Sequence, residues 1–222
     1  MTKTIFIPCR SETDVELVSR SIIEKVDCLG SIGLVTTAQF VNDLPEIKKR
    51  LEKAGKKVII LSGRPNPGQV LGCDAHAAKG ADCYIYVGTG HFHPLRVAIE
   101  TGKPTFMAHP SGGIERLPDE LIMKHAKIRA ARIHRFREAK TVGLIVSTKP
   151  GQNRMKQALE LKKRLKGAKE TFIFAANEIK PDYFIGYDVD AWVNTACPRI
   201  AEDKFDKPVL DISEVESAIH SQ

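Results

Sequence analysis

The chain has 222 residues, of which 42% are hydrophobic and 27% charged, and its formal net charge is +7. This composition is typical of a folded globular protein, and the length suits one large domain or two small ones. No stretch approaches the roughly 20 apolar residues of a membrane span, and the N-terminal apolar run is too short for a signal peptide. We therefore expect a cytoplasmic protein whose five cysteines are thiols rather than disulfides.

Short apolar runs alternate with helical patterns along the first half of the chain. The pattern predicts strands at 3–8, 32–36, 57–61, 82–87 and 104–107, and helices at 12–26, 40–54 and 94–100. Ser11 is expected to cap the first helix and Gly55 to end the second. Residues 108–117 are expected to form a loop.

The second half opens with a long helix and then continues the same alternation. It predicts helices at 118–139, 155–166 and 213–219, and strands at 142–147, 171–174, 191–193 and 208–210. Strands that alternate with helices indicate parallel sheets in an α/β fold.

The two halves also resemble each other. The segment IGLVTTAQFVNDLPEIKKRLEKAGKKVII is similar to VGLIVSTKPGQNRMKQALELKKRLKGAKETFIF, YIYVGTG aligns with DAWVNTA, and GKPTFM aligns with DKPVLD. We therefore predict two similar α/β domains, each a small parallel sheet flanked by helices. The first spans residues 1–117 and contains Cys73; the second spans 118–222, with the long helix and Cys197.

Polar loops follow several of the predicted strands. Ligands of open α/β sheets bind beyond the carboxyl ends of strands, so we expect these loops to carry the chemistry. They are residues 36–39, 88–93, 148–153 and the Cys197 loop. The loop with Gly151 and Gln152 precedes a helix, where free N–H groups bind an anion or simply start the helix.

Cysteine and histidine residues gather between positions 73 and 93. Cys73-x-x-His76 and His91-x-His93 are the ligand types of a zinc site. An equally good interpretation is that His91 and His93 are polar loop residues that form hydrogen bonds with the backbone. Both alternatives stay open at this point.

Much of the positive charge lies in the segment Lys124–Lys140, which has seven Lys/Arg and one acid, Glu138. Such a run is either the solvated face of a helix or a docking surface for an acidic or RNA-bound partner. Because no aromatic interleaving or known nucleic-acid motif accompanies it, we expect no direct nucleic-acid binding.

Several blocks together resemble the diphthamide-synthesis family of 3-amino-3-carboxypropyl transferases. They are TTAQFVNDLPEIKKRLEKAGKKV, GQVLGC, YVGTGHFHPL, ETGKP, GLIVSTKPGQ and DAWVNTACPRI, in this order. The family uses S-adenosylmethionine and a [4Fe–4S] cluster, and its members have three similar α/β domains that each give one cysteine to the cluster. This chain resembles the second and third of those domains.

The resemblance implies that Cys73 and Cys197 are cluster ligands and that translation elongation factor 2 is the substrate. It further implies that S-adenosylmethionine is bound by Gln39, Gly88, Thr89, His91, His93, Gly151 and Gln152. It assigns no catalytic residue.

The chain also departs from the family pattern. Two matched cysteines leave a third thiolate to come from a second copy or a partner chain; Cys9 is the nearest spare. The usual Gly-Asp-Gly-Arg-Phe-His is Gly88-Thr89-Gly90-His91-Phe92-His93 here, and Gly-Arg-Gln is Pro150-Gly151-Gln152. The alternatives are a non-catalytic subunit or scaffold, and an unrelated Cys/His metal enzyme.

Overall fold

The computed structural model describes residues 5, 7, 9–63, 65–72 and 74–220. Cys73 therefore lies outside the described residues, as do residues 3, 4, 6 and 8 of the first predicted strand. The described positions in that segment contradict the prediction, because Ile5 and Ile7 are 83% and 80% exposed and belong to no strand. An apolar run forms a strand only where a neighbouring strand pairs with it, and none of the strands in the described part of the chain pairs with these two residues.

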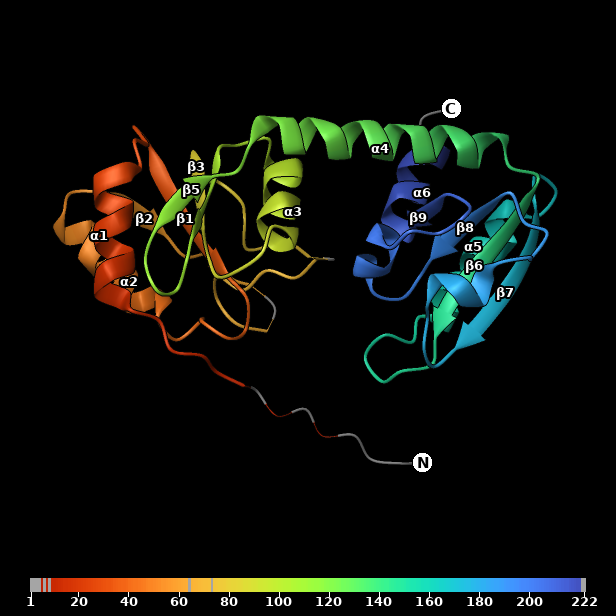
Figure 1. Ribbon diagram of the computed structural model, residues 1–222, viewed down its shortest axis with the longest axis horizontal. Coiled ribbons are helices and arrows are strands. Elements are labelled where there is room, and N and C mark those ends of the chain that lie inside the picture. Colours follow the sequence, from red (N-terminus) through yellow and green to blue (C-terminus); the bar gives the residue numbers. More distant parts are fainter. Residues whose placement is uncertain (1–4, 6, 8, 64, 73, 221–222) are drawn as a thin grey trace. The chain divides into compact units, whose positions relative to one another are not determined.

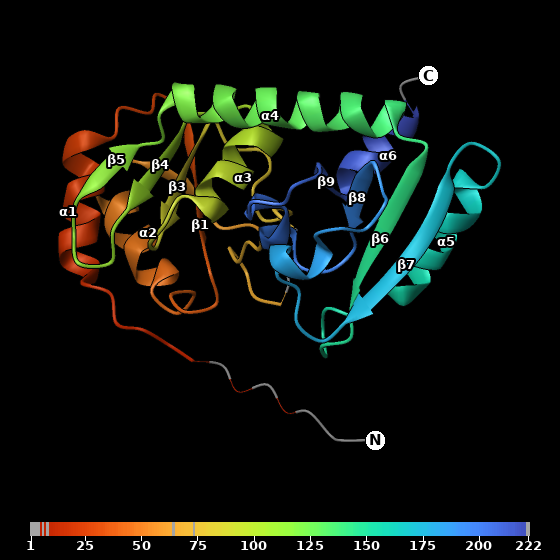
Figure 2. The same ribbon diagram turned by 45° about the vertical axis from the view of Figure 1, so that its right-hand side comes forward.

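The chain divides into two compact units, one ending at Met123 and the other beginning at Lys124 (Figure 1, Figure 2). The division falls inside α4 (Asp119–Glu138). The domain boundary predicted between residues 117 and 118 stays a prediction.

The first unit is a mixed sheet with helices on both faces (Figure 1). Its elements are α1 (Val15–Lys25), β1 (Ser31–Thr36), α2 (Leu44–Lys53), β2 (Lys57–Ile59), β3 (Cys83–Val87), α3 (Phe92–Thr101), β4 (Thr105–Ala108) and β5 (Ile114–Arg116). The strand order is β2-β1-β3-β4-β5, with β5 antiparallel to β4 and the other pairs parallel. The loop predicted at 108–117 is therefore wrong where β5 pairs with β4.

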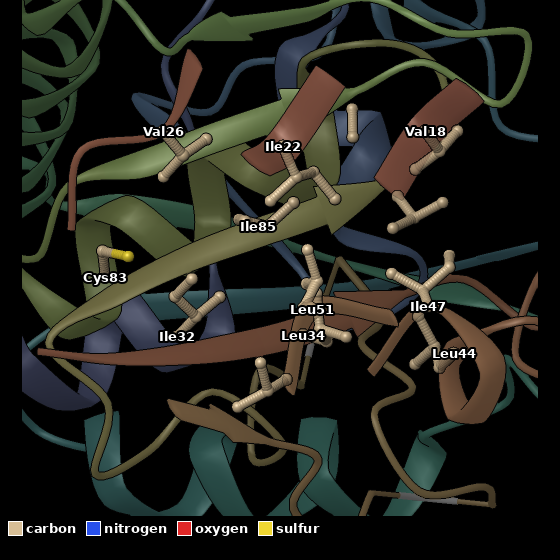
Figure 3. Packing of buried hydrophobic residues seen from close by; sticks show 13 residues of the cluster. Val18, Ile22, Val26, Ile32, Leu34, Leu44, Ile47, Leu51, Cys83 and Ile85 are labelled. Carbon is tan, nitrogen blue, oxygen red and sulfur yellow. The ribbon is translucent and has the colours of Figure 1, made fainter. Parts of the chain in front are cut away.

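The main core of this unit lies between the sheet and the pair α1 and α2. Alternate residues of β1, Ile32 and Leu34, point to the same face and meet Ile22 of α1 and Ile47 of α2 (Figure 3). All four are fully buried. Each such side chain contributes about 1.5–3 kcal/mol of burial free energy, so this face fixes how α1 and α2 pack on the sheet.

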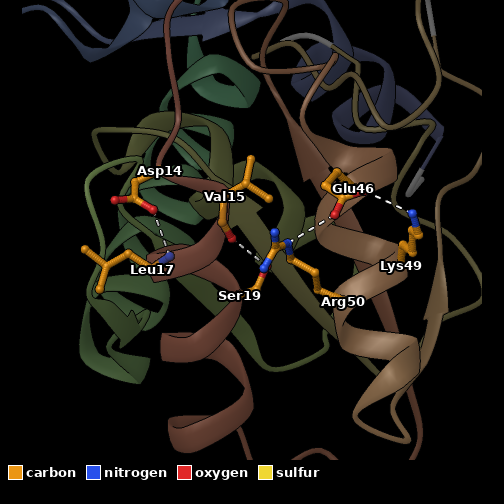
Figure 4. A network of polar contacts seen from close by, with 7 residues as sticks. All are labelled: Asp14, Val15, Leu17, Ser19, Glu46, Lys49 and Arg50. Atoms are coloured by element: carbon orange, nitrogen blue, oxygen red, sulfur yellow. Dashed lines mark hydrogen bonds and ion pairs between the residues drawn. The ribbon is translucent and has the colours of Figure 1, made fainter.

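The start of α1 differs from the prediction. Asp14, not Ser11, is the N-cap: its Oδ1 accepts a hydrogen bond of 2.9 Å from the Leu17 N–H (Figure 4). The backbone N–H of Ser11 instead donates to the Gln39 carbonyl at 3.1 Å. Aspartate and serine are comparable caps, so composition alone could not decide between them. Gly55 does end α2, with φ of 79°.

The second unit is a parallel sheet with the order β7-β6-β8-β9. After α4 its elements are β6 (Thr141–Ser147), α5 (Met155–Leu165), β7 (Glu170–Ala176), the 3-10 helix η1 (Pro181–Phe184), β8 (Ala191–Asn194), the 3-10 helix η2 (Pro198–Glu202), β9 (Val209–Asp211) and α6 (Ile212–His220). Residues of α4, α5 and α6 pack on one face of the sheet (Figure 2). On the other face, Trp192 is fully buried against aromatic rings from β7 and η1.

The internal repeat is confirmed by pairing across the central strands. Gly33 of β1 pairs with Tyr84 of β3, and Gly143 of β6 pairs with Trp192 of β8. In both pairs the aromatic ring lies against the glycine: a Cβ on Gly33 would come within 2.6 Å of Tyr84, and one on Gly143 within 2.1 Å of Trp192. Each glycine is therefore required by the ring that covers it.

The same pairs correct one part of the predicted alignment. They make Tyr84 equivalent to Trp192, whereas aligning YIYVGTG with DAWVNTA places Tyr86 there. The alignment of GKPTFM with DKPVLD is right, because the Tyr84 N–H donates to the Pro104 carbonyl as the Trp192 N–H does to that of Pro208. Similar loop residues after β3 and β8 shifted the strand alignment by two positions.

Candidate functional site

A hollow of about 580 Å³ opens at the carboxyl ends of the strands in the first unit. Gln39 follows β1, Thr89 follows β3, and both line this hollow. The structure thus brings together two of the residues that the resemblance assigns to S-adenosylmethionine.

Polar groups that the sequence did not single out line the same hollow. The hydroxyl oxygen of Thr13 is buried and has no hydrogen-bond partner in the described part of the chain. His109 Nδ1 lies 2.7 Å from Ser111 Oγ and 3.3 Å from the Ser111 backbone N–H nitrogen, which donates to it. His109 and Ser111 follow β4, and the rule that marked the other loops could have found them.

The histidines between positions 76 and 93 are not gathered with other described side chains into a group of metal ligands. His91 is exposed, with its Nε2 4.0 Å from a Glu115 carboxylate oxygen. His93 stacks on Tyr86 with ring centroids 5.9 Å apart, and burial lowers its pKa, which keeps the ring neutral. No three His, Cys, Asp or Glu side chains among the described residues are grouped to hold a metal ion. The described positions of His76, His91 and His93 therefore give no support to the hypothesis of a zinc site.

Other residues of the predicted cofactor loop have structural tasks. Gly88 is buried, and its N–H donates to the Ala108 carbonyl at 3.0 Å. The ring of Tyr86 lies beneath this loop, and burial raises the pKa of its hydroxyl to about 12. The tyrosine therefore stays protonated at neutral pH.

The loop after β6 in the second unit is a tight turn. Gln152 N–H donates to the Lys149 carbonyl at 3.1 Å, with Pro150 second and Gly151 third at φ of 79°, which is the pattern of a type II turn. Asn153 Oδ1 then accepts from the Met155 N–H at 3.1 Å, at the start of α5. Gly151 and Gln152 are thus held at the carboxyl end of β6; a ligand for them stays a prediction.

Cys197 lies just beyond the carboxyl end of β8. It is a free, half-buried thiol and the residue before η2. The buried Asn194 holds its backbone, because Asn194 Nδ2 donates to the Cys197 carbonyl at 2.8 Å. Thr195, also buried, donates its hydroxyl proton to the Ile145 carbonyl at 2.9 Å. The thiol therefore projects from a loop with a fixed backbone.

The remaining described cysteines differ from Cys197. Cys83 is 2% exposed inside β3, and burial raises the pKa of its thiol well above the usual range. Cys9 is exposed, and Cys28 is half-buried at the edge of the same core. Cys73 lies outside the described residues, so its role rests on the sequence.

The predicted basic run forms most of α4. Of the residues of this helix, Phe136 is buried, while Lys124 and Lys127 are exposed. Arg132 donates to the Ala201 carbonyl at 2.7 Å and Arg129 pairs with Glu214 at 3.5 Å. Part of the basic run thus packs within the second unit, and part faces solvent.

No helix in the described ranges has the length and apolar character needed to cross a membrane.

The fold and these loops define a class: an α/β protein of two repeated units, with candidate ligand residues at the carboxyl edge of each sheet. The whole chain, residues 1–222, matches the family model of diphthamide synthesis proteins, and it belongs to that family.

Known relatives support the assignment. The chain is 35% identical to the 2-(3-amino-3-carboxypropyl)histidine synthase of Pyrococcus horikoshii, over 96% of this chain and 64% of the relative. It is 32% identical to subunit 1 of the human 2-(3-amino-3-carboxypropyl)histidine synthase, over 81% of this chain and 43% of the relative.

A solved structure agrees with the fold. The crystal structure of Dph2 from Pyrococcus horikoshii with a 4Fe-4S cluster superposes with a TM-score of 0.85 at 33% identity. That match covers 96% of this chain and 64% of the other. The chain therefore spans less than two thirds of the length of these relatives.

Proposed function

We propose that this chain takes part in the transfer of a 3-amino-3-carboxypropyl group from S-adenosylmethionine to a histidine of translation elongation factor 2 or a related protein. The observation that carries the proposal is the Cys197 loop, a free and half-buried thiol held at the carboxyl end of β8. Its relatives are named for this reaction product, and one was crystallised with a 4Fe-4S cluster.

The residues present fit a [4Fe–4S] cluster in part. Cys197 and Cys73 would each supply a thiolate, the ligand type that holds such clusters. When bound, the cluster supplies the electron for cleaving S-adenosylmethionine between sulfur and the γ-carbon. A third thiolate would come from a second copy of the chain or from a partner chain. The cytosol, a reducing compartment, keeps such thiols available.

The hollow in the first unit is the proposed place for part of S-adenosylmethionine. Gln39 and Thr89 line it together, and its polar groups include the unpartnered Thr13 hydroxyl. The chain's task there is to bind and orient the cofactor. The other residues proposed to contact the cofactor are Gly88, His91, His93, Gly151 and Gln152.

A second candidate function is that of a non-catalytic subunit that completes such an enzyme. It is favoured by the two matched cysteines, which are one thiolate fewer than a cluster with an open iron needs. In this case activity would require a second, cysteine-bearing chain.

Binding of S-adenosylmethionine tests the first proposal. Equilibrium dialysis with anaerobically reconstituted protein should show binding, and Gln39→Ala or Thr89→Ala should each raise Kd about tenfold, the effect of losing a good hydrogen bond to a ligand. After reduction, the chain should release methylthioadenosine, the part of S-adenosylmethionine that remains after transfer.

The matched control is Gln157→Ala, which removes the same functional group from an exposed position on α5 and should leave Kd unchanged. No binding by the reconstituted protein would count against the proposed site. If the chain binds S-adenosylmethionine but releases methylthioadenosine only after a second chain is added, the result would favour the non-catalytic subunit.

A further inference from the structure

Asn194, the last residue of β8, is a polar side chain in a buried position, with 1% exposure. Burial of an amide is unfavourable unless its hydrogen bonds are made, so a buried asparagine needs partners. Its partners all lie in the second unit, around Cys197.

The amide makes three hydrogen bonds that agree on its orientation. Nδ2 donates to the Cys197 carbonyl and to Asp211 Oδ1, both at 2.8 Å, and Oδ1 accepts from the Ala196 N–H at 3.0 Å. A flipped amide would face two acceptors with its oxygen and a donor with its nitrogen, so only this orientation satisfies the partners. Two of the three bonds hold the backbone of Ala196 and Cys197, and the third joins the amide to the Asp211 side chain of β9.

We call Asn194 with these three hydrogen bonds the clamp. The neighbouring strand β9 supports it. Asp211 pairs with Asn194 in register across β8 and β9, and its N–H donates to Glu214 Oε2 at 2.9 Å. Glu214 in turn pairs with Arg129 of α4 at 3.5 Å. A continuous polar chain therefore runs from the basic helix to the backbone of the cysteine.

The equivalent position in the first unit shows that the fold alone does not require this clamp. By strand pairing Asn194 is equivalent to Tyr86, as Trp192 is to Tyr84. In the first unit the strand continues to Val87, and the side chain is an aromatic ring packed against His93. The second unit instead ends its strand with an amide directed at a cysteine loop.

We propose that Asn194, supported by Asp211, is a positioning residue that fixes Cys197 as a cluster ligand. This assignment of purpose rests on the proposed function; the clamp itself can be measured without a cluster. A rigid loop places the thiolate before the metal arrives, so less ordering is needed when it binds.

The test is the rate at which iodoacetamide alkylates Cys197 in the whole, metal-free chain, followed by peptide-resolved mass spectrometry. Asn194→Ala and Asp211→Ala should each raise the rate about fivefold, the factor expected from the loss of one net hydrogen bond. The double variant should react little faster than the faster single variant, because both act through one clamp.

The matched control is Asp190→Ala. Asp190 lies just before the other end of β8 and accepts hydrogen bonds from the Lys140 and Thr141 N–H groups, both at 2.8 Å. This variant loosens the unit without touching the Cys197 loop, and it should leave the alkylation rate of Cys197 unchanged. If Asn194→Ala fails to fold, Asp211→Ala removes a partner of the same amide.

The outcomes distinguish failure of the positioning role of Asn194 from failure of the proposed cluster binding. Unchanged alkylation in folded Asn194→Ala and Asp211→Ala would overturn the proposal, as would equal acceleration in Asp190→Ala. In reconstituted protein, transfer of iron to a chelator should be faster in the clamp variants by a similar factor, and an unchanged rate would overturn the positioning role. If wild-type protein takes up no iron, the proposed function fails, and alkylation still decides whether Asn194 holds the thiol.

Discussion

Asp82 and Asp190 occupy equivalent places just before β3 and β8. Asp82 accepts hydrogen bonds from the Ser31 N–H at 2.7 Å and hydroxyl at 2.8 Å, and Asp190 accepts from the Thr141 N–H at 2.8 Å and hydroxyl at 3.0 Å. The backbone N–H bonds, with the hydroxyl bonds, lower the pKa of both carboxyl groups. Each carboxylate joins the starts of two neighbouring strands.

These carboxylates should make stability depend on pH in the acid range. Because their folded-state pKa lies below the unfolded value of about 3.9, their contribution is present above that pH and is lost as the pH falls through the folded pKa. Asp82→Asn and Asp190→Asn should therefore lower the free energy of unfolding in urea at pH 7, by less as the pH falls below about 4.

The control is Asp43→Asn at the start of α2, where the side chain makes no capping hydrogen bond, and it should show little effect at any pH. A difference between wild type and the Asp82 or Asp190 variant that stays constant down to about pH 2 would contradict this role.

Among individual residues, the sequence identified Cys197 as a candidate site residue but gave no sign of the role of Asn194. A cysteine that follows a buried strand is recognisable from the sequence as a candidate ligand, because the residue type alone supplies the thiol. The role of Asn194 depends on Asp211, 17 positions later, and on the register between β8 and β9. His109 and Thr13 were missed for a related reason, because tertiary packing brings them beside Gln39 and Thr89.

Among the elements, those with a long periodic pattern were predicted best. The helix predicted at 118–139 is α4, Asp119–Glu138, and the strand predicted at 142–147 is β6, Thr141–Ser147. β5 was missed because it is a short, largely exposed strand with two charged residues, and antiparallel pairing with β4 decides its structure. Ile5 and Ile7 show the converse, since they have an apolar pattern but pair with no strand among the described residues.

The helix α4 leads to a prediction about the partner. If it is the docking surface for elongation factor 2, reversal of exposed charges in Lys124→Glu with Lys127→Glu should slow association on the order of several-fold, because such charges act mainly on the encounter rate. Stopped-flow or surface-binding kinetics at low and high salt would measure it, with the wild-type rate falling as salt rises.

Lys162→Glu with Lys163→Glu on α5 makes the same change of charge on another exposed face of the second unit. Equal slowing by both pairs would show that net charge, rather than α4, governs the encounter. No slowing by the α4 pair would remove this helix as the docking surface.

The whole chain consists of two repeats of one α/β plan, a property visible in the sequence. Both sheets share the order of their first four strands, β2-β1-β3-β4 and β7-β6-β8-β9. The repeats differ beyond the strands: the first unit has α3 after β3, whereas the second has the short η2 after β8. The glycine–aromatic pairs were not evident, because they depend on register between strands rather than on order along the chain.

The charge is also unevenly divided between the two units. Residues 124–222 have 19 Lys/Arg and 13 Asp/Glu, a net charge of +6, while residues 1–123 have 15 and 14. Most of the net positive charge therefore belongs to the unit that contains Cys197. Composition showed the charge excess, and the division of the chain shows where it lies.

The most direct measurement is iron and acid-labile sulfide per chain after anaerobic reconstitution, with the ultraviolet–visible spectrum. We predict a brown protein that contains both elements, and loss of colour with a large fall in both in Cys197→Ala and in Cys73→Ala. Cys83→Ala, which removes a buried core thiol, should retain the cluster. Colourless wild-type protein, or full iron content in Cys197→Ala, would contradict the proposed role of Cys197 as a cluster ligand.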